Sequence, residues 1–147
     1  MQAATENQMG KVTTTLVITN RLDEGKAEDG LIPIEQVSSV TLENVLVDTG
    51  ATTLCLPKDV IARLGLKILK QVVVETGTGI SEARIFQDAS ISLCGREGTF
   101  DCVELPEGKT ALLGKLPMEA LGIEIDLKNQ ILKVLPDGQT ETYLTIL

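Results

Sequence analysis

The sequence of 147 residues contains no histidine and no tryptophan, and its only aromatic residues are Phe86, Phe100 and Tyr143. Without histidine, neither a Ser-His-Asp nor a Cys-His catalytic arrangement can form, and no imidazole can bind a metal ion. Hydrolytic chemistry in this chain would therefore rest on carboxylates. Because aromatic side chains are scarce, we expect an aliphatic core built from Val, Ile, Leu and Ala.

Clusters of basic residues and long apolar runs are also absent. The net charge is −8, from 13 basic and 21 acidic residues, which argues against binding to a nucleic-acid backbone. No apolar stretch approaches the roughly 20 residues that a membrane-spanning helix needs. The polar residues 1–8 lack the apolar core of a signal peptide. We expect a soluble, cytoplasmic protein with no membrane or nucleic-acid partner.

Cysteine is rare, with Cys55, Cys94 and Cys102 alone in the chain. An odd count without a signal peptide favours reduced thiols, and the absence of a C-x-x-C motif argues against a zinc site. Cys94 and Cys102 flank an expected hairpin turn, but a disulfide between them is disfavoured in the cytoplasm. Cys55 is expected to be a small buried residue and not a nucleophile, since no base is available to activate it.

What the chain does contain is a series of short apolar and β-branched segments separated by turns, which predicts an all-β fold. We expect one domain over residues 11–147, preceded by a flexible extension at 1–10. The charged segment 21–30 predicts an exposed loop, and segments 57–65 and 117–121 predict two short helices. The expected strands are 12–19, 31–37, 40–48, 72–75, 80–86, 89–94, 99–105, 111–114, 123–127, 131–135 and 142–147.

A weak internal repeat links the two halves. Segment 56–68 resembles segment 116–125, and each copy follows an apolar strand that ends at a glycine, Gly50 or Gly114. The second copy is three residues shorter in its helix. This pattern suggests duplicated halves with pseudo-twofold symmetry, of which the first alone carries an acid at the strand end.

That acid is Asp48, in the run Val-Leu-Val-Asp-Thr-Gly-Ala at 45–51. An apolar strand carries the carboxylate toward the interior, where charge is costly. Gly50 permits a tight turn and lets its amide approach the carboxylate, while the hydroxyl of Thr49 can hold the turn. The motif predicts a rigid, partly desolvated acid.

One such acid is a poor hydrolase, but two acids about 3 Å apart share a single proton and can act together. The ionised acid then takes a proton from the attacking water, and the protonated acid donates to the carbonyl oxygen. The sequence holds a single Asp-[Ser/Thr]-Gly. A pair must therefore come from two chains related by a twofold axis.

The run at 45–52 resembles the active-site strand of retropepsin-like aspartic proteases. Ala-Leu-Leu-Gly at 111–114, with the helix and hairpin that follow to residue 132, is similar to the second-half signature of that family. The likeness spans about residues 11–135 and is greatest to the small clan-AA proteins of bacteria, cyanobacteria in particular. It implies a closed β-barrel with two short helices and a homodimeric aspartic endopeptidase without cofactors.

The resemblance assigns roles to individual residues. Asp48 is expected to be the catalytic acid, and the active-site loop is completed by Thr49, Gly50 and Ala51, with the hydroxyl of Thr49 bonding across the dimer. The hairpin 72–86 fits the flap that closes over a peptide. Its tip, the expected substrate-binding segment, is Thr76, Gly77, Thr78 and Gly79. The candidates for side-chain pockets are Thr52, Thr53 and Cys55.

The family's dimers also join through a sheet of chain termini, and the apolar tail 142–147 is a candidate for that role. The polar N-terminus, which precedes the family core, would be an accessible substrate for self-processing. The charged loop 21–30 and the Lys115-Leu116-Pro117 start of the second helix depart from the family's pattern.

Other interpretations remain open at this point. Asp48-Thr49-Gly50 could be an ordinary strand-end turn in a monomeric β-domain. The chain could also keep the fold as a dimeric peptide-binding or scaffolding module with little proteolysis. A nucleotide-binding loop at Gly77-x-Gly79 is disfavoured, because residue 82 is Glu where a third glycine is needed.

Overall fold

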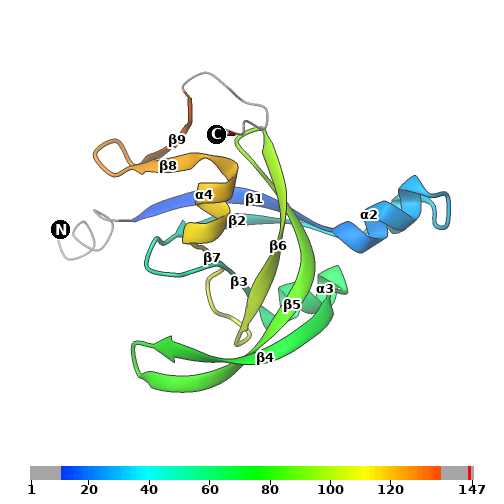
Figure 1. The fold of residues 1–147 in the computed structure, drawn as a ribbon, viewed down its shortest axis with the longest axis horizontal. Helices are drawn as coiled ribbons and strands as arrows, with labels where there is room; N and C mark the ends of the chain where they lie inside the picture. Colours follow the sequence, from blue (N-terminus) through cyan, green and yellow to red (C-terminus); the bar gives the residue numbers. More distant parts are fainter. Residues whose placement is uncertain (1–10, 137–145, 147) are drawn as a thin grey trace.

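The computed structural model describes residues 11–136 and Ile146, and it confirms the all-β class (Figure 1). Three α-helices and one 3-10 turn accompany the strands in these residues. The elements are β1 (Val12–Asn20), α2 (Arg21–Glu28), η1 (Ile34–Gln36), β2 (Ser39–Val47), β3 (Leu54–Pro57), α3 (Lys58–Leu64), β4 (Lys67–Thr76), β5 (Gly79–Leu93), β6 (Arg96–Leu105), β7 (Leu112–Leu113), α4 (Lys115–Leu121), β8 (Ile123–Asp126) and β9 (Ile131–Val134).

Seven of the strands pair in the order β1-β2-β7-β3-β6-β5-β4. Strand β1 also pairs with β5, so six of them close into a ring and β4 stays outside it. The predicted barrel takes the form of this ring. Strands β8 and β9 form a separate two-stranded sheet. The β4–β5 hairpin extends from the ring as a long curved arm (Figure 1).

The core inside the ring is aliphatic, as the composition predicts. Aliphatic side chains from strands β1, β2, β3, β5 and β7 and from α3 are almost fully buried, while Phe86 is the single buried aromatic residue among those described. Full burial of each such side chain contributes about 1.5–3 kcal/mol to the stability of the folded state. The most buried aliphatic residues are Leu16, Ile18, Val45, Leu54, Leu56, Leu64, Ile91 and Leu113.

The two predicted helices are present as α3 and α4, and each ends at a glycine in the left-handed conformation, Gly65 (φ 64°) and Gly122 (φ 67°). The predicted difference in length is wrong, because both helices have seven residues. Helix α4 begins at Lys115, two residues ahead of the expected start at Pro117. Proline is tolerated there because the first helical turn needs no internal N–H donors.

The prediction of an exposed loop at 21–30 is wrong, because Arg21–Glu28 forms helix α2. The side-chain oxygen of Asn20 accepts a hydrogen bond from the amide of Asp23 (3.0 Å) and caps the helix. The side-chain nitrogen Nδ2 of Asn20 donates to the carbonyl of Leu64 (2.9 Å) and so joins this end of β1 to α3. Helix α2 has no buried residue and projects from the body (Figure 1). Its stability comes from the cap and not from an apolar stripe, which explains why periodicity gave no signal.

The strand expected at 31–37 is also absent. Pro33 has no N–H to donate to a sheet, and the 3-10 turn η1 follows it at Ile34–Gln36. Leu31 and Ile34 remain 72% and 75% exposed, so no sheet face buries them. The apolar and β-branched residues of this segment predicted a strand, but the described part of the chain has no neighbouring strand for it to pair with.

The turn between β5 and β6 is tighter than the four-residue turn at 95–98 that the glycines suggest. Cys94 (φ 53°) and Gly95 (φ 80°) both have left-handed backbones, as a two-residue type I′ hairpin requires. Arg96 therefore opens strand β6 and turns inward. The N-terminal extension at 1–10 and most of the predicted strand at 142–147 lie outside the described residues, so both stay predictions.

Candidate active site

Asp48 lies directly after strand β2, at the end of the parallel pairing between β2 and β7. Leu46 pairs with Leu112 and Val47 with Leu113. The amide of Asp48 donates to the carbonyl of Leu113 at 3.0 Å. The first half of the chain thus supplies the acid, and a hydrogen bond from the second half fixes the position of its backbone at the end of β2. The Asp48 side chain is half-buried.

The Asp-Thr-Gly turn folds back on the carboxylate. The amide of Gly50 donates to Oδ1 of Asp48 at 2.8 Å, and the amide of Ala51 donates to the Asp48 carbonyl at 3.1 Å. A Cβ on residue 50 would lie 3.0 Å from the same Oδ1. The expected approach of the Gly50 amide is present, and it fixes the direction of the carboxylate.

The start of α4 holds the rest of this loop, residues 49–53. The first amides of an α-helix have no partner within the helix. In α4 the amide of Lys115 donates to the Ala51 carbonyl (2.8 Å), and that of Leu116 donates to the Thr52 carbonyl (2.9 Å). The helix therefore satisfies its own orphan donors by clamping the loop that follows Asp48.

Gly114 makes this clamp possible. A Cβ at this position would lie within 2.7 Å of backbone atoms of both Ala51 and Thr53, with the Thr53 carbonyl oxygen nearest. Its φ of −92° is open to any residue, so close approach is the reason for glycine here. On the other side of the loop, the hydroxyl of Thr53 donates to the Asp101 carbonyl (3.3 Å).

The expected flap corresponds to the hairpin of β4 and β5, in register from Lys67–Gln87 to Thr76–Gly79. The hydroxyl of Thr76 donates to the Gly79 carbonyl (3.0 Å) and accepts from the amide of Thr78 (3.3 Å), which closes the tip. Thr76, Gly77, Thr78 and Gly79 are all exposed. In Figure 1 this tip points to the same side of the molecule as the loop between β2 and β3.

The family model described as gag-polyprotein putative aspartyl protease matches residues 36–121. The match runs from just before β2 to the end of α4. It includes the Asp48 loop, the β4–β5 hairpin and Gly114. The chain belongs to this aspartyl protease family.

A solved structure supports the same fold. The EIAV protease in complex with the inhibitor HBY-793 superposes with a TM-score of 0.55 at 19% sequence identity. The alignment covers 79% of this chain and 92% of the viral one. The comparison with curated proteins finds no match. The retroviral-protease fold is therefore shared at a low level of sequence identity.

Within this member of the aspartyl protease family, Cys55 lies against the loop but cannot serve as a nucleophile. Its thiol is buried and donates to the Thr53 carbonyl (3.7 Å). Burial, followed by the negative charge of Asp48, raises the pKa of Cys55 to about 11. The thiol therefore stays protonated at neutral pH, as a small buried residue would.

The other expected site residues differ in accessibility. Thr49, Gly50 and Thr52 are exposed, whereas Ala51 and Thr53 are half-buried. All three cysteines are free, with Cys94 exposed and Cys102 buried. The described part of the chain has no cluster of three or more His, Cys, Asp or Glu that could hold a metal ion. None of its helices is long and apolar enough to cross a membrane.

A groove of about 500 Å³ lies beside the exposed Thr49. One wall is α4 and the other is the first strand of the β8–β9 hairpin. The lining residues include Lys115, Met118, Ile123, Ile125 and Leu127. The Asp48 loop thus lies beside a surface made by the second half of the chain.

Sequence reasoning missed two groups of residues around the site. The backbone clamp from Lys115 and Leu116 has no side-chain signature, although the glycine-terminated strand before α4 pointed to that region. Arg84 and Glu104, described below, are 20 residues apart in the sequence. They meet because Ile85 of β5 pairs with Val103 of β6 at this end of the two strands.

Proposed function

We propose that this chain is an aspartic endopeptidase that works as a homodimer, with one Asp48 from each subunit. The observation that carries the proposal is the Asp48 loop, in which the Gly50 amide holds Oδ1 at 2.8 Å and α4 clamps the next residues. A rigidly aimed carboxylate at the end of a buried strand is what acid catalysis of hydrolysis requires. Membership of the aspartyl protease family supports it.

The requirement for two subunits follows from the count of acids. The sequence has one Asp-Thr-Gly, and the matching position of the second half is Gly114, which has no acid beside it. A twofold axis beside Asp48 would bring two identical carboxylates together. Two carboxylates at such a distance hold one proton between them, and their pKa values belong to the pair.

The chemistry then needs no metal or organic cofactor. The ionised Asp48 takes a proton from a water molecule, and the resulting nucleophile attacks the carbonyl carbon of the peptide bond. The protonated Asp48 of the other subunit donates its proton to the carbonyl oxygen. Collapse of the tetrahedral intermediate with proton transfer to the nitrogen releases the amine. Activity should favour acidic to neutral pH, where the dyad holds one proton.

The substrate would be an extended peptide lying between the loop and the β4–β5 hairpin. Exposed strand edges recognise extended chains through backbone hydrogen bonds. The glycines at 77 and 79 suit a tip that moves when the peptide binds and leaves. The pocket candidates Thr52, Thr53 and Cys55 follow the catalytic loop. The polar extension at 1–10 is a possible substrate of the enzyme itself.

The groove beside Thr49 is where we place the approach of the second subunit. Thr49 is exposed there, so its hydroxyl is free to reach the loop of a symmetry-related chain. Leu127 and Ile131 of the neighbouring hairpin are 55% and 51% exposed, and a second subunit would cover such apolar side chains.

The alternative is a dimeric peptide-binding or scaffolding module of the same fold with little catalysis. The same hairpin and loop would hold a peptide without cleaving it. A third possibility is a monomer in which Asp48 only closes a turn. The three hypotheses differ in oligomeric state and in what Asp48 contributes.

The deciding experiment measures cleavage of a peptide library from pH 4 to pH 8 by wild type, Asp48→Asn and Asp59→Asn. Asp59 is exposed in the first turn of α3, so Asp59→Asn changes the same functional groups away from the loop. We expect wild type and Asp59→Asn to cleave and Asp48→Asn to be inactive. Sedimentation of each protein gives the oligomeric state in the same buffers.

Each other outcome points to a different hypothesis. Cleavage by Asp48→Asn at the wild-type rate would refute the aspartic mechanism. A wild-type dimer that binds peptides and cleaves none would support the binding module. A wild-type protein that stays monomeric at high concentration could not form the dyad.

A further inference from the structure

Arg96 is the one buried charged side chain among the residues that the structure describes. It is 1% exposed, although it stands next to a two-residue turn at the end of a hairpin. Burying a guanidinium is costly unless its donors find partners. A buried arginine at a turn therefore calls for a reason beyond the turn itself.

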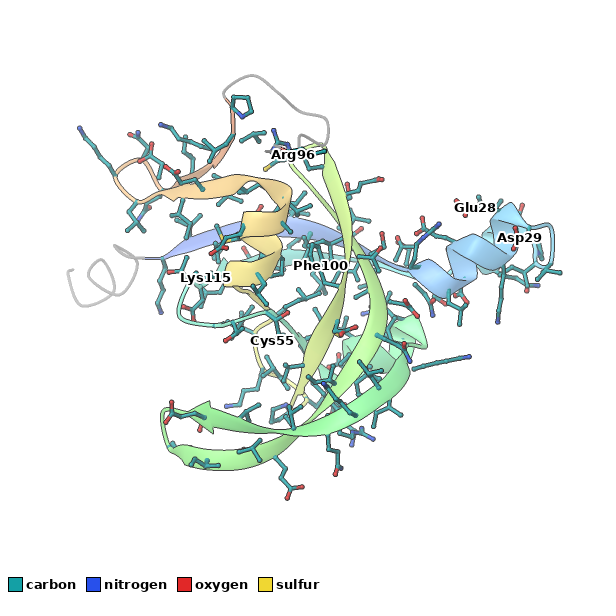
Figure 2. The ribbon with its side chains drawn as sticks, in the orientation of Figure 1. Glu28, Asp29, Cys55, Arg96, Phe100 and Lys115 are labelled. Carbon is teal, nitrogen blue, oxygen red and sulfur yellow. The ribbon has the colours of Figure 1, made fainter. Side chains whose placement is uncertain are left out.

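Arg96 donates hydrogen bonds to backbone carbonyls at the end of α4 and after β9. Nη1 donates to the Leu121 carbonyl (2.6 Å) and to that of Gly122 (3.3 Å), at the end of α4. Nη2 donates to the Leu135 carbonyl (2.6 Å), one residue after β9. Figure 2 shows Arg96 at the tip of the β5–β6 hairpin.

These contacts hold both ends of the β8–β9 hairpin. Gly122 immediately precedes β8, and Leu135 immediately follows β9. The amide of Leu135 also donates to the Gly122 carbonyl (2.8 Å), so the two ends meet at the guanidinium. A Cβ on residue 122 would meet Nη1 of Arg96, so a larger residue would displace the guanidinium as well as strain the left-handed backbone at this position (φ 67°).

The hairpin depends on such an anchor because its strands pair only with each other in the described part of the chain. An isolated two-stranded hairpin is marginal in water. Ile123 is buried and Ile125 and Leu132 pack partly against the core, and apolar burial of this kind is non-directional. Charge-assisted hydrogen bonds are directional, so those of Arg96 add an orientation that the apolar contacts lack.

Strand β8 supplies one wall of the groove beside Thr49, through Ile123, Glu124 and Ile125. The position of that wall relative to the Asp48 loop therefore depends on how the hairpin is anchored. We propose that Arg96 is a positioning residue for dimer formation: it holds the β8–β9 hairpin in the orientation that a second copy of this chain needs in order to dock beside Thr49. The inference rests on the homodimer proposed above.

Arg96 acts in this scheme without touching the partner subunit or the carboxylates. Loss of its hydrogen bonds should weaken association, because each monomer must then order the hairpin when it binds. Once the dimer has formed, the dyad is the same as in the wild type. The expected signature is a higher dimer dissociation constant with kcat per dimer preserved.

The test compares wild type, Arg96→Met, Arg96→Lys and Arg63→Met. Methionine keeps the apolar bulk and removes the donors, and lysine keeps one donor group. Arg63 is exposed on α3, so Arg63→Met is the matched control. The dissociation constant is measured by sedimentation equilibrium, and peptide cleavage is measured over a range of protein concentrations.

We expect Arg96→Met to raise the dissociation constant at least about tenfold, Arg96→Lys to raise it less, and Arg63→Met to leave it unchanged. At concentrations that saturate the dimer, kcat should stay within about twofold of wild type. A tandem fusion of two Arg96→Met copies through a flexible linker should recover activity at low concentration, since tethering replaces lost affinity.

An unchanged dissociation constant in folded Arg96→Met or Arg96→Lys would overturn the inference. So would a loss of kcat that persists in the saturated or tethered dimer, because Arg96 would then act on the catalytic loop. If Arg96→Met does not fold, Arg96→Lys and its tandem fusion decide by the same criteria. A wild-type protein that is monomeric or inactive would instead refute the proposed function itself.

Discussion

Arg84 donates two hydrogen bonds to the carboxylate of Glu104, from Nε to Oε1 at 2.9 Å and from Nη2 to Oε2 at 2.7 Å. The guanidinium also lies 5.2 Å from the ring centroid of Phe86. Glu104, first through its hydrogen bonds and then through its charge, raises the pKa of Arg84. The pair joins β5 to β6 at the base of the β4–β5 hairpin, where a moving flap would pivot.

We predict that Glu104→Gln loosens the connection between β5 and β6 at the base of the β4–β5 hairpin. Glutamine has nearly the same shape but presents one acceptor oxygen in place of two and has no charge, so the two-pronged contact is lost. The hairpin should then sample more orientations, and closing over a peptide should cost more. Steady-state kinetics should show KM raised several-fold with kcat within about twofold of wild type.

Glu97→Gln is the control for that change, because Glu97 is exposed on the same strand and away from Arg84. Its kinetics should match those of the wild type. Equal KM values for Glu104→Gln and wild type would mean that the ion pair has no part in flap movement.

We predict that Gly114→Ala disrupts the hydrogen bonds by which α4 holds the loop after Asp48. The new methyl group would meet the backbone of Ala51 and Thr53, and no flexible side chain can move aside. Overpacking of this kind costs about 1–3 kcal/mol of unfolding free energy. Urea denaturation should show that loss, and peptide cleavage should fall with it because the loop after Asp48 must shift.

Gly77→Ala provides the comparison for stability, since a Cβ at residue 77 meets nothing within 4 Å. Its unfolding free energy should stay within about 0.5 kcal/mol of wild type. If Gly114→Ala were as stable as Gly77→Ala and as active as wild type, the close approach of α4 to the loop would have no energetic role.

The buried thiols predict a loss of stability at alkaline pH. Burial raises the pKa of Cys55 to about 11 and that of Cys102 to about 12, from an ordinary value of 9.0. Below pH 9 both thiols are protonated in the folded and unfolded states, and their contribution is complete. Between pH 9 and 12 the unfolded state releases these protons first, so unfolding becomes easier as the pH rises.

Urea denaturation from pH 8 to pH 11 measures this slope, with a contribution on the order of 1 kcal/mol per pH unit from each thiol. Cys55→Ala and Cys102→Ala should each flatten the slope, while Cys94→Ala, at an exposed position, should change it least. Identical slopes in all four proteins would show that neither buried thiol titrates on unfolding.

Short-range chemistry explains where the sequence predicted the fold correctly. The two short helices were predictable because Gly65 and Gly122 end them locally, and the turn at 76–79 because glycines and threonines separate two apolar runs. Helix α2 was missed because a single buried side chain, Asn20, caps it while its own residues show no apolar stripe. The segment 31–37 has the composition of a strand but no neighbour to pair with.

The sequence by itself determined the turn at Asp48, Thr49 and Gly50 and the aspartyl protease family, and it predicted Asp48 as the catalytic acid. A carboxylate ahead of a glycine at the end of an apolar strand, in a chain with no histidine, predicts hydrolysis by carboxylates. Adjacent residues suffice for this prediction, because the backbone conformation and burial of the turn depend on them. Tertiary structure alone decided what supports that loop, which is the amides of α4 and the close approach of Gly114. It also decided the contacts farther from the loop, which are the Arg84–Glu104 pair and the anchoring of β8–β9 by Arg96. Those contacts join residues tens of positions apart, so they depend on strand register and packing, which no local pattern of residues specifies.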